Sequence, residues 1–161
     1  MAKAPPLSFL FQHPAHLIAC GFGSGLAPKA PGTFGTLFAL ISFPLLRWAM
    51  DDMQLLVFLA AAYALGIWAI GITGKAIGEP DHGSIVWDEI VPFWFVLLLT
   101  PDGWLWWAIA FALFRFFDIV KLPPAGWFDR NMKTGFGVMA DDACAAGHTL
   151  IVLALLKWLI G

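Results

Sequence analysis

Charged residues are scarce in this sequence. Aspartate, glutamate, lysine and arginine make up 12% of its 161 residues, whereas they make up about 25% of a typical soluble domain. Hydrophobic residues reach 60%, and the mean hydropathy is +0.80. This composition argues against a water-soluble domain and indicates an integral membrane protein long enough for one domain.

The sequence also has only two cysteines and no excess of positive charge. Cys20 and Cys144 lie far apart and form no CxxC pair, so the sequence predicts no disulfide framework. The net charge is −2, whereas nucleic-acid binding calls for a basic patch. The N-terminus shows no cleavable signal pattern, because prolines and short apolar runs follow Lys3.

Long apolar runs are abundant, and they predict an all-α, membrane-embedded bundle of about five helices in a single domain, 1–161. The runs cover about 34–50, 54–74, a stretch ending near Leu99, 104–117 and 138–160. A span needs about 20 apolar residues, so the third and fourth runs are short unless 87–89 extend the third inward. Residues 5–20 are shorter still and broken by proline, so we expect an interfacial or packed helix there.

The distribution of basic residues predicts the orientation of such a bundle. If five spans alternate, seven of the nine basic residues lie on one side, which the positive-inside rule places in the cytoplasm. Eight of the eleven acids lie on that side too, and the rule does not account for them. A polar site at the cytoplasmic membrane face would account for these acids. The basic residues are Lys3, Lys29, Lys75, Arg115, Lys121, Arg130 and Lys133, and the acids are Glu79, Asp81, Asp88, Glu89, Asp118, Asp129, Asp141 and Asp142.

Two of these acid groups are adjacent pairs inside apolar sequence. Asp88 and Glu89 open the third run, and Asp141 and Asp142 follow Gly137 at the start of the fifth. Carboxylates in such positions are costly to bury. Helix capping is the simpler explanation, but the second pair lies beyond the usual capping position, which favours a functional role.

A glycine- and proline-rich loop, residues 21–35, precedes the first apolar run. Glycines let backbone N–H groups approach an anion closely, and a helix N-terminus adds positive potential. Lys29 supplies a formal charge, and Thr33 could cap the helix or donate to a phosphate oxygen. The loop is not a Walker A motif, so by itself it is a weak indication of phosphate binding.

Carboxylates gathered with Arg115, Lys121 and this loop suit phosphoryl chemistry. Magnesium binds through a few carboxylates while it retains water and touches phosphate. Lysine and arginine neutralise the non-bridging oxygens in the transition state. Because both acidic pairs lie at the membrane face, where lipid headgroups lie, the pattern suggests hydrolysis of a lipid phosphate.

Four motifs in order resemble the phosphatidylglycerophosphatase A family over most of the chain. The resemblance implies an all-helical, multi-pass enzyme of the bacterial inner membrane that faces the cytoplasm. It would use Mg²⁺ to convert phosphatidylglycerophosphate into phosphatidylglycerol and inorganic phosphate. Three positions differ from the usual family pattern, which has proline, glycine and proline where this sequence has His82, Pro92 and Leu122. These differences affect loop or helix-end geometry without removing a charge. The motifs are Gly23-Ser24-Gly25 with 30–35, Val86-Trp87-Asp88-Glu89, 114–121 and 135–142.

The resulting hypothesis assigns a role to each polar group. Glu89, Asp141 and Asp142 are the expected metal ligands, followed by Asp88 and Asp81. Asp118 would orient or deprotonate the attacking water, and Asp88 and Asp81 are the other two expected catalytic residues. The expected phosphate-binding residues are Lys29, Gly32, Thr33, Arg115 and Lys121.

Three alternatives remain open at this point. Intramembrane acids often mark the ion path of a transporter or channel, although here they gather at one face. A phospholipid-synthesising phosphotransferase would also use Mg²⁺, but its spaced acidic motif is missing. A packing subunit without activity would leave so many charges at one face unexplained.

Overall fold

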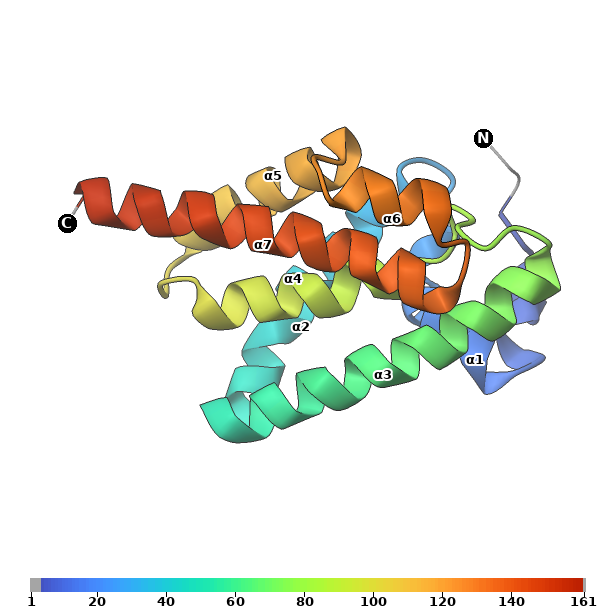
Figure 1. Cartoon of the computed structure of the whole chain (residues 1–161). Helices are drawn as coiled ribbons and strands as arrows, with labels where there is room; N and C mark the ends of the chain where they lie inside the picture. Colours follow the sequence, from blue (N-terminus) through green and yellow to red (C-terminus); the bar gives the residue numbers. More distant parts are fainter. Residues whose placement is uncertain (1–3, 161) are drawn as a thin grey trace.

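The computed structural model describes residues 4–160, and over that range the chain is all-helical (Figure 1). The predicted fold class is therefore confirmed at this level. Two short 3₁₀ helices, η1 (Leu7–Phe11) and η2 (Gly21–Leu26), flank α1 (Pro14–Ala19). The longer elements follow as α2 (Pro31–Ala49), α3 (Asp52–Ile77), α4 (Trp87–Leu99), α5 (Trp104–Val120), α6 (Ala125–Asn131) and α7 (Gly135–Ile160).

Three of these helices, α2, α3 and α7, are long and apolar enough to cross a membrane. The α4 helix has 13 residues and α5 has 17, fewer than the ~20 that a span requires. Membrane crossing by these two helices, and an interfacial position for the N-terminal segment, therefore stay predictions.

Local sequence determines where the long helices begin and end. The Asp51 side chain accepts a hydrogen bond from the Gln54 N–H, and Gln54 accepts one in return, so the two form a capping box at the start of α3. The same helix ends at Gly78, whose φ of 87° suits glycine. At the start of α7, the Thr134 hydroxyl accepts from the Gly137 N–H at 3.2 Å.

The short α4 helix lies at the centre of the bundle. Nine of its 13 residues are buried, and it packs against α2, α3, α5 and α7. Its tryptophans are tied to neighbouring helices, since Trp87 Nε1 donates to the Ala62 carbonyl at 3.0 Å and Trp94 Nε1 donates to the Ala39 carbonyl at 3.1 Å. These bonds satisfy indole groups that would otherwise be buried without partners.

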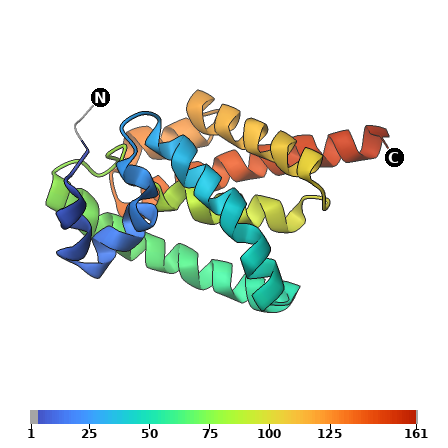
Figure 2. The same ribbon diagram turned by 180° about the vertical axis from the view of Figure 1, so that it is seen from behind.

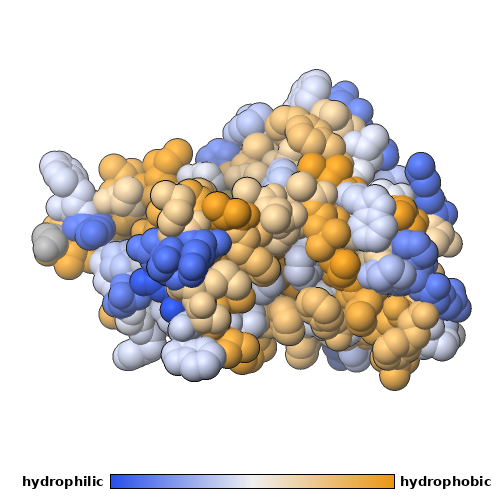
Figure 3. Space-filling view, turned by 90° about the horizontal axis from the view of Figure 1, so that it is seen from below, coloured by the Kyte–Doolittle hydropathy of each residue, from blue (hydrophilic) through white to orange (hydrophobic). Residues whose placement is uncertain are grey.

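The surface fits a membrane environment. Figure 3 shows a face on which hydrophobic residues cover the middle, while hydrophilic residues gather toward its two ends. Trp48, Trp104 and Trp158 are largely exposed. They lie at the end of α2, the start of α5 and the end of α7, which is where aromatic side chains collect at a membrane interface.

At the opposite end of the bundle lie the starts of α2, α4 and α7 and the end of α5 (Figures 1 and 2). The loop 78–86 lies at this end as well, and α6 packs against α7. Most of the acidic and basic residues discussed above belong to these segments. The fold therefore brings them together at one end of an apolar bundle.

Candidate active site

A polar cleft of about 250 Å³ opens at this end of the bundle. Its walls come from the start of α2, the loop 81–85, the start of α4, the end of α5 and the start of α7. The charged residues that line it are Asp81, Asp88, Glu89, Arg115, Asp118, Lys121, Asp141 and Asp142. Segments far apart in the sequence thus contribute to one site.

One side of the cleft is organised around Glu89. Arg115 forms ion pairs with Glu89 and with Asp118, the latter at 2.7 Å between Arg115 Nη1 and Asp118 Oδ2. The buried Thr36 hydroxyl lies 2.9 Å from Glu89 Oε2 and 3.0 Å from the Gly32 carbonyl oxygen. This network fixes the orientation of the Glu89 carboxylate, because a guanidinium and a hydroxyl hold the same oxygen.

Gly32 makes that arrangement possible. It is the second residue of α2 and lines the cleft against the Glu89 carboxyl group. A Cβ atom at this position would lie 2.7 Å from Glu89 Cδ and 2.8 Å from Glu89 Oε2, well inside the ~3.5 Å of ordinary carbon contact. The helix backbone can therefore approach the carboxylate only where there is no side chain.

The other side of the cleft is organised around Lys121. Its ammonium pairs with Asp141, lies 3.1 Å from Asp129 Oδ1 and reaches Asp81 Oδ2 at 4.0 Å. Burial by itself would lower the pKa of Lys121, but its hydrogen bonds to Asp141 and Asp129 outweigh this and raise the pKa. The lysine is therefore held in its charged form, ready to interact with an anion.

The backbone at Lys121 is unusual. This residue caps α5 in the left-handed region, with φ at 50°, and its N–H donates to the Phe117 carbonyl. Non-glycine residues rarely adopt that conformation and store strain when they do. Here it turns the chain at the end of α5 while the side chain projects among three carboxylates.

The loop carboxyl Asp81 differs from the others because 38% of its side chain is exposed. Burial of the remainder is the main cause that raises the pKa of Asp81, and the nearby Lys121 charge opposes the rise. A carboxyl with a raised pKa takes up a proton more readily, which is useful for proton exchange with bound water.

Two carboxylates in the cleft have no cation beside them among residues 4–160. Asp88 is 5% exposed and Asp142 is 4% exposed, and neither forms an ion pair within this range, unlike Glu89, Asp118 and Asp141. Asp88 Oδ1 is also buried without a hydrogen-bond partner. Buried charge without compensation is costly, so a bound cation would stabilise this pair.

The donor set suits magnesium with few protein ligands. Within residues 4–160, no three histidine, cysteine, aspartate or glutamate side chains are arranged to hold a metal ion by themselves. Magnesium commonly binds through one or two carboxylates and completes its shell with water and substrate phosphate. Asp88 and Asp142 therefore fit such an ion, since the remaining ligands would come from water and a phosphate group.

Comparison with known proteins identifies the family. A sequence model described as Phosphatidylglycerophosphatase A matches residues 17–157. The chain belongs to this family. A Haemophilus influenzae phosphatidylglycerophosphatase A is 44% identical over 150 residues, 92% of each chain. The Escherichia coli protein of the same name is 42% identical over 135 residues, 83% of this chain and 78% of the relative.

A third relative has a different name. A Bacteroides thetaiotaomicron protein provisionally named phosphatidylinositol-3-phosphatase is 44% identical over 153 residues, 90% of this chain and 94% of the relative. The phosphatidylglycerophosphatase A family consists of lipid phosphatases, so the chain belongs to a family of enzymes. No solved structure gives a significant match.

Most of the site residues expected from the sequence line the same cleft, namely Gly32, Asp81, Asp88, Glu89, Arg115, Asp118, Lys121, Asp141 and Asp142. Two do not. Lys29 is exposed and Thr33 is half-buried, and neither lines the cleft. Lys3, counted with the basic side, lies outside the described residues. The assigned roles of all these side chains stay predictions.

Two residues at the site, Thr36 and Asp129, were not among the site residues predicted from the sequence. Thr36 is fully buried and lies within 3.4 Å of Arg115 Nη1 as well as beside Glu89. A hydroxyl one turn into an apolar run was the available indication. Asp129, counted above only among the acids of the cytoplasmic side, pairs with Lys121 and with Lys133, the latter at 3.7 Å.

Proposed function

We propose that this protein hydrolyses the terminal phosphate of phosphatidylglycerophosphate, with Mg²⁺, at the cytoplasmic face of the bacterial inner membrane. The products would be phosphatidylglycerol and inorganic phosphate. The substrate is supported by the names of the family and of two relatives. The cytoplasmic orientation is supported by the excess of basic residues in the loops at the cleft end.

The observation that carries the proposal is the cleft itself. Five acidic side chains from α4, α5 and α7 face one arginine and one lysine at the polar end of an apolar bundle. A phosphate monoester at a membrane surface needs such an arrangement, because cations must neutralise the phosphate while carboxylates position water or metal. A soluble phosphatase would not need three helices apolar enough to span a membrane.

The contacts support a role for each of these residues. Arg115 and Lys121 bind the non-bridging oxygens of the phosphate from opposite sides of the cleft. Asp118, held by Arg115 at 2.7 Å, orients the attacking water. Water adds to phosphorus, the bond from phosphorus to the glycerol oxygen breaks, and the departing oxygen takes a proton. Asp81, whose pKa burial raises, accepts the proton that the attacking water loses and returns one to the departing oxygen.

Asp88 and Asp142 would hold the magnesium ion, with Glu89 and Asp141 beside them. When bound, the ion polarises the phosphoryl group and lowers the pKa of water. The protein's own contribution is to keep these two carboxylates buried and without cationic partners among the described residues. This ligand pair differs from the set expected from the sequence, which was Glu89, Asp141 and Asp142. Arg115 and Lys121 already balance Glu89 and Asp141, so we assign these two carboxylates mainly to positioning those cations.

A headgroup panel tests the proposal. Purified protein in detergent–lipid micelles is given phosphatidylglycerophosphate, phosphatidylinositol-3-phosphate or phosphatidic acid, with Mg²⁺ or with excess chelator. We expect rapid phosphate release from phosphatidylglycerophosphate, slower release from the other two, and loss of release on chelation. Faster release from the inositol lipid would reassign the substrate, and full activity under chelation would refute the metal requirement.

A further inference from the structure

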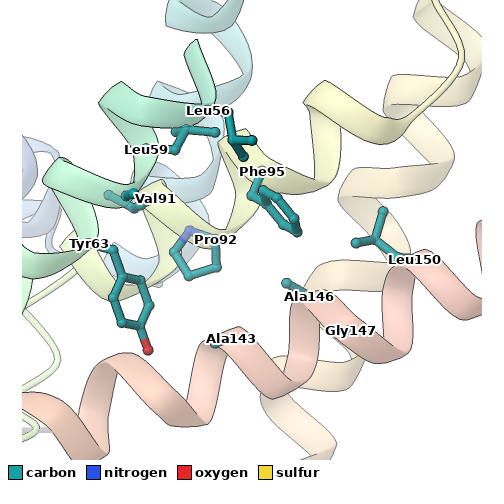
Figure 4. A pocket seen from close by; sticks show the side chains of 11 residues that line it. Leu56, Leu59, Tyr63, Val91, Pro92, Phe95, Ala143, Ala146, Gly147 and Leu150 are labelled. Carbon is teal, nitrogen blue, oxygen red and sulfur yellow. The ribbon is translucent and has the colours of Figure 1, made fainter. Parts of the chain in front are cut away.

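A second cavity, apolar rather than polar, lies between α3, α4 and α7 (Figure 4). Its volume is about 300 Å³, and Tyr63 is the lining residue whose side chain carries a polar group. Leu56, Ala60 and Gly147 are exposed, so the cavity is a groove open at the side of the bundle. The other lining residues are Leu59, Val91, Pro92, Phe95, Ala143, Ala146 and Leu150.

The groove continues the helix faces that begin in the polar cleft. On α4, Asp88 lines the cleft, and Pro92 and Phe95, four and seven residues later, line the groove. On α7, Asp142 lines the cleft and Ala146 lines the groove. Residues at these spacings share a helix face, so the two cavities follow one another along the interface of α4 and α7.

The groove also runs in the direction of a lipid tail. In Figure 4, Tyr63 and Ala143 lie at one end, and Phe95 and Leu150 lie toward the other. At 1.5 Å of rise per residue, the part of α7 that lines the groove, from Ala143 to Leu150, extends over about 10 Å. One leaflet contributes about half of a ~30 Å hydrocarbon core. The groove therefore extends over about two-thirds of the depth of one leaflet, and it begins one residue beyond Asp142.

A hydrocarbon chain suits the groove, because the groove is apolar and continues from the cleft in which the phosphate of the same lipid would bind. A Cβ added at Gly147 would have no atom within 4 Å, so the α7 wall leaves free space where a side chain would otherwise lie. A flexible chain fits such a narrow space.

We propose that this groove holds one acyl chain of the phospholipid whose phosphate occupies the polar cleft. The inference rests on the proposed function. An acyl chain that moves from bilayer to groove exchanges one apolar surrounding for another, so it gains little hydrophobic free energy. The groove consequently contributes position: it aligns the long axis of the lipid so that the phosphate lies between Arg115 and Lys121.

Gly147 offers a direct test, because a leucine there fills the groove without a clash at Cβ. Gly147→Ala is the first control, since it adds a helix-favouring methyl and leaves most of the groove free. Ala154→Leu is the second, since Ala154 is exposed on the same helix and does not line the groove. Each variant is assayed on long-chain phosphatidylglycerophosphate in micelles and on its water-soluble dihexanoyl analogue.

We expect Gly147→Leu to lower kcat/KM for the long-chain lipid by about tenfold or more, as loss of alignment does in other enzymes. Turnover of the dihexanoyl analogue, and both controls, should remain near the wild type. Equal activity of Gly147→Leu on both lipids, at the wild-type level or below it, would overturn the inference. So would a dimer that Gly147→Leu dissociates, because that result would assign the groove to a second copy.

A binding measurement separates this inference from the proposed function. Phosphatidic acid with a diazirine in one acyl chain is photolysed with each variant, and labelled peptides from 143–150 are quantified against a matching phosphatidylcholine probe. We expect the phosphate monoester to label this stretch more strongly in the wild type than in Gly147→Leu, whether or not the preparation releases phosphate. Equal labelling by both probes would refute the groove assignment, while absent turnover with selective labelling would refute only the reaction.

Discussion

The contact between Gly32 and Glu89 allows a test that changes no charge. In Gly32→Ala, the new Cβ would lie 2.7 Å from Glu89 Cδ. Carbon atoms in contact prefer about 3.5–4.0 Å, so the carboxyl group must retreat by about 1 Å. Arg115 and Thr36 hold the same carboxylate, and they must shift with it.

Displacements of about 1 Å in a positioned group can lower a rate by 10²-fold. We therefore expect Gly32→Ala to reduce kcat/KM for phosphate release from phosphatidylglycerophosphate by about 100-fold, which corresponds to about 2.7 kcal/mol. The helix itself should tolerate alanine, because alanine is favoured over glycine in helices by about 1 kcal/mol. Folding and membrane accumulation should thus persist.

The matched control is Gly83→Ala. Gly83 lines the same cleft, and the nearest atom to its added Cβ is Pro31 Cγ, at an ordinary 3.8 Å. Its activity should stay within a few-fold of the wild type. If Gly32→Ala keeps an activity within threefold of Gly83→Ala, with the same thermal midpoint, the close approach of α2 to Glu89 has no catalytic role and the reasoning fails.

Two further predictions follow from the contacts around the cleft. Thr36→Val removes the hydroxyl 2.9 Å from Glu89 Oε2. Since an unsatisfied buried acceptor costs about 1–3 kcal/mol, we expect a lower thermal midpoint and at least tenfold lower kcat/KM, and Thr36→Ser should restore both. Unchanged activity and stability in Thr36→Val would remove Thr36 from the site. Burial favours a higher pKa for Asp129, but its bonds to Lys121 lower the pKa below the usual value. The stability this provides is present above the unfolded pKa of about 3.9 and is lost as pH falls through the folded pKa. Asp129→Asn should accordingly lower the thermal midpoint at pH 7 by about 2–4 °C, or ~1 kcal/mol for a partly exposed pair. Below pH 4 it should lower the midpoint by less. If the wild type and the variant differ as much below pH 4 as at pH 7, the ion pair does not stabilise the fold.

The longest apolar runs of the sequence predicted the three longest helices. The runs at 34–50, 54–74 and 138–160 correspond to α2, α3 and α7, with each helix extended by a few residues. Such boundary differences arise because caps, such as Asp51 and Gly78, end a helix beyond its apolar stretch. The central position of α4 was not predictable, because a short apolar run has the same sequence pattern whether it is buried in protein or in lipid.

The cleft could be anticipated in outline for a physical reason. Charged groups in apolar sequence are costly unless they meet each other, so acids and bases at one membrane face predict a common site. Most of the pairing within the site was not accessible from the sequence. Arg115 and Asp118 are three residues apart and pair, as helical spacing suggests, but Thr36 beside Glu89 depends on how α2 crosses α4.

Lys29 illustrates the opposite limit. A lysine in a glycine-rich loop before a helix is typical of phosphate sites, and the sequence offers no means to tell where its side chain points. In the structure, Lys29 is exposed and Lys121 occupies the cleft with Asp81, Asp129 and Asp141. The left-handed turn at Lys121 places this lysine there, and such a backbone conformation leaves no pattern in the sequence.

The central claim is that Asp88 and Asp142, two buried carboxylates without a cationic partner among residues 4–160, support hydrolysis of a lipid phosphate. The most direct measurement is phosphate release from phosphatidylglycerophosphate by the purified wild type and by Asp142→Asn, which keeps the shape of the side chain and removes its charge. We expect Mg²⁺-dependent release by the wild type and a loss of at least 100-fold in a variant that still folds. Undiminished release by Asp142→Asn, or none by the wild type, would contradict it.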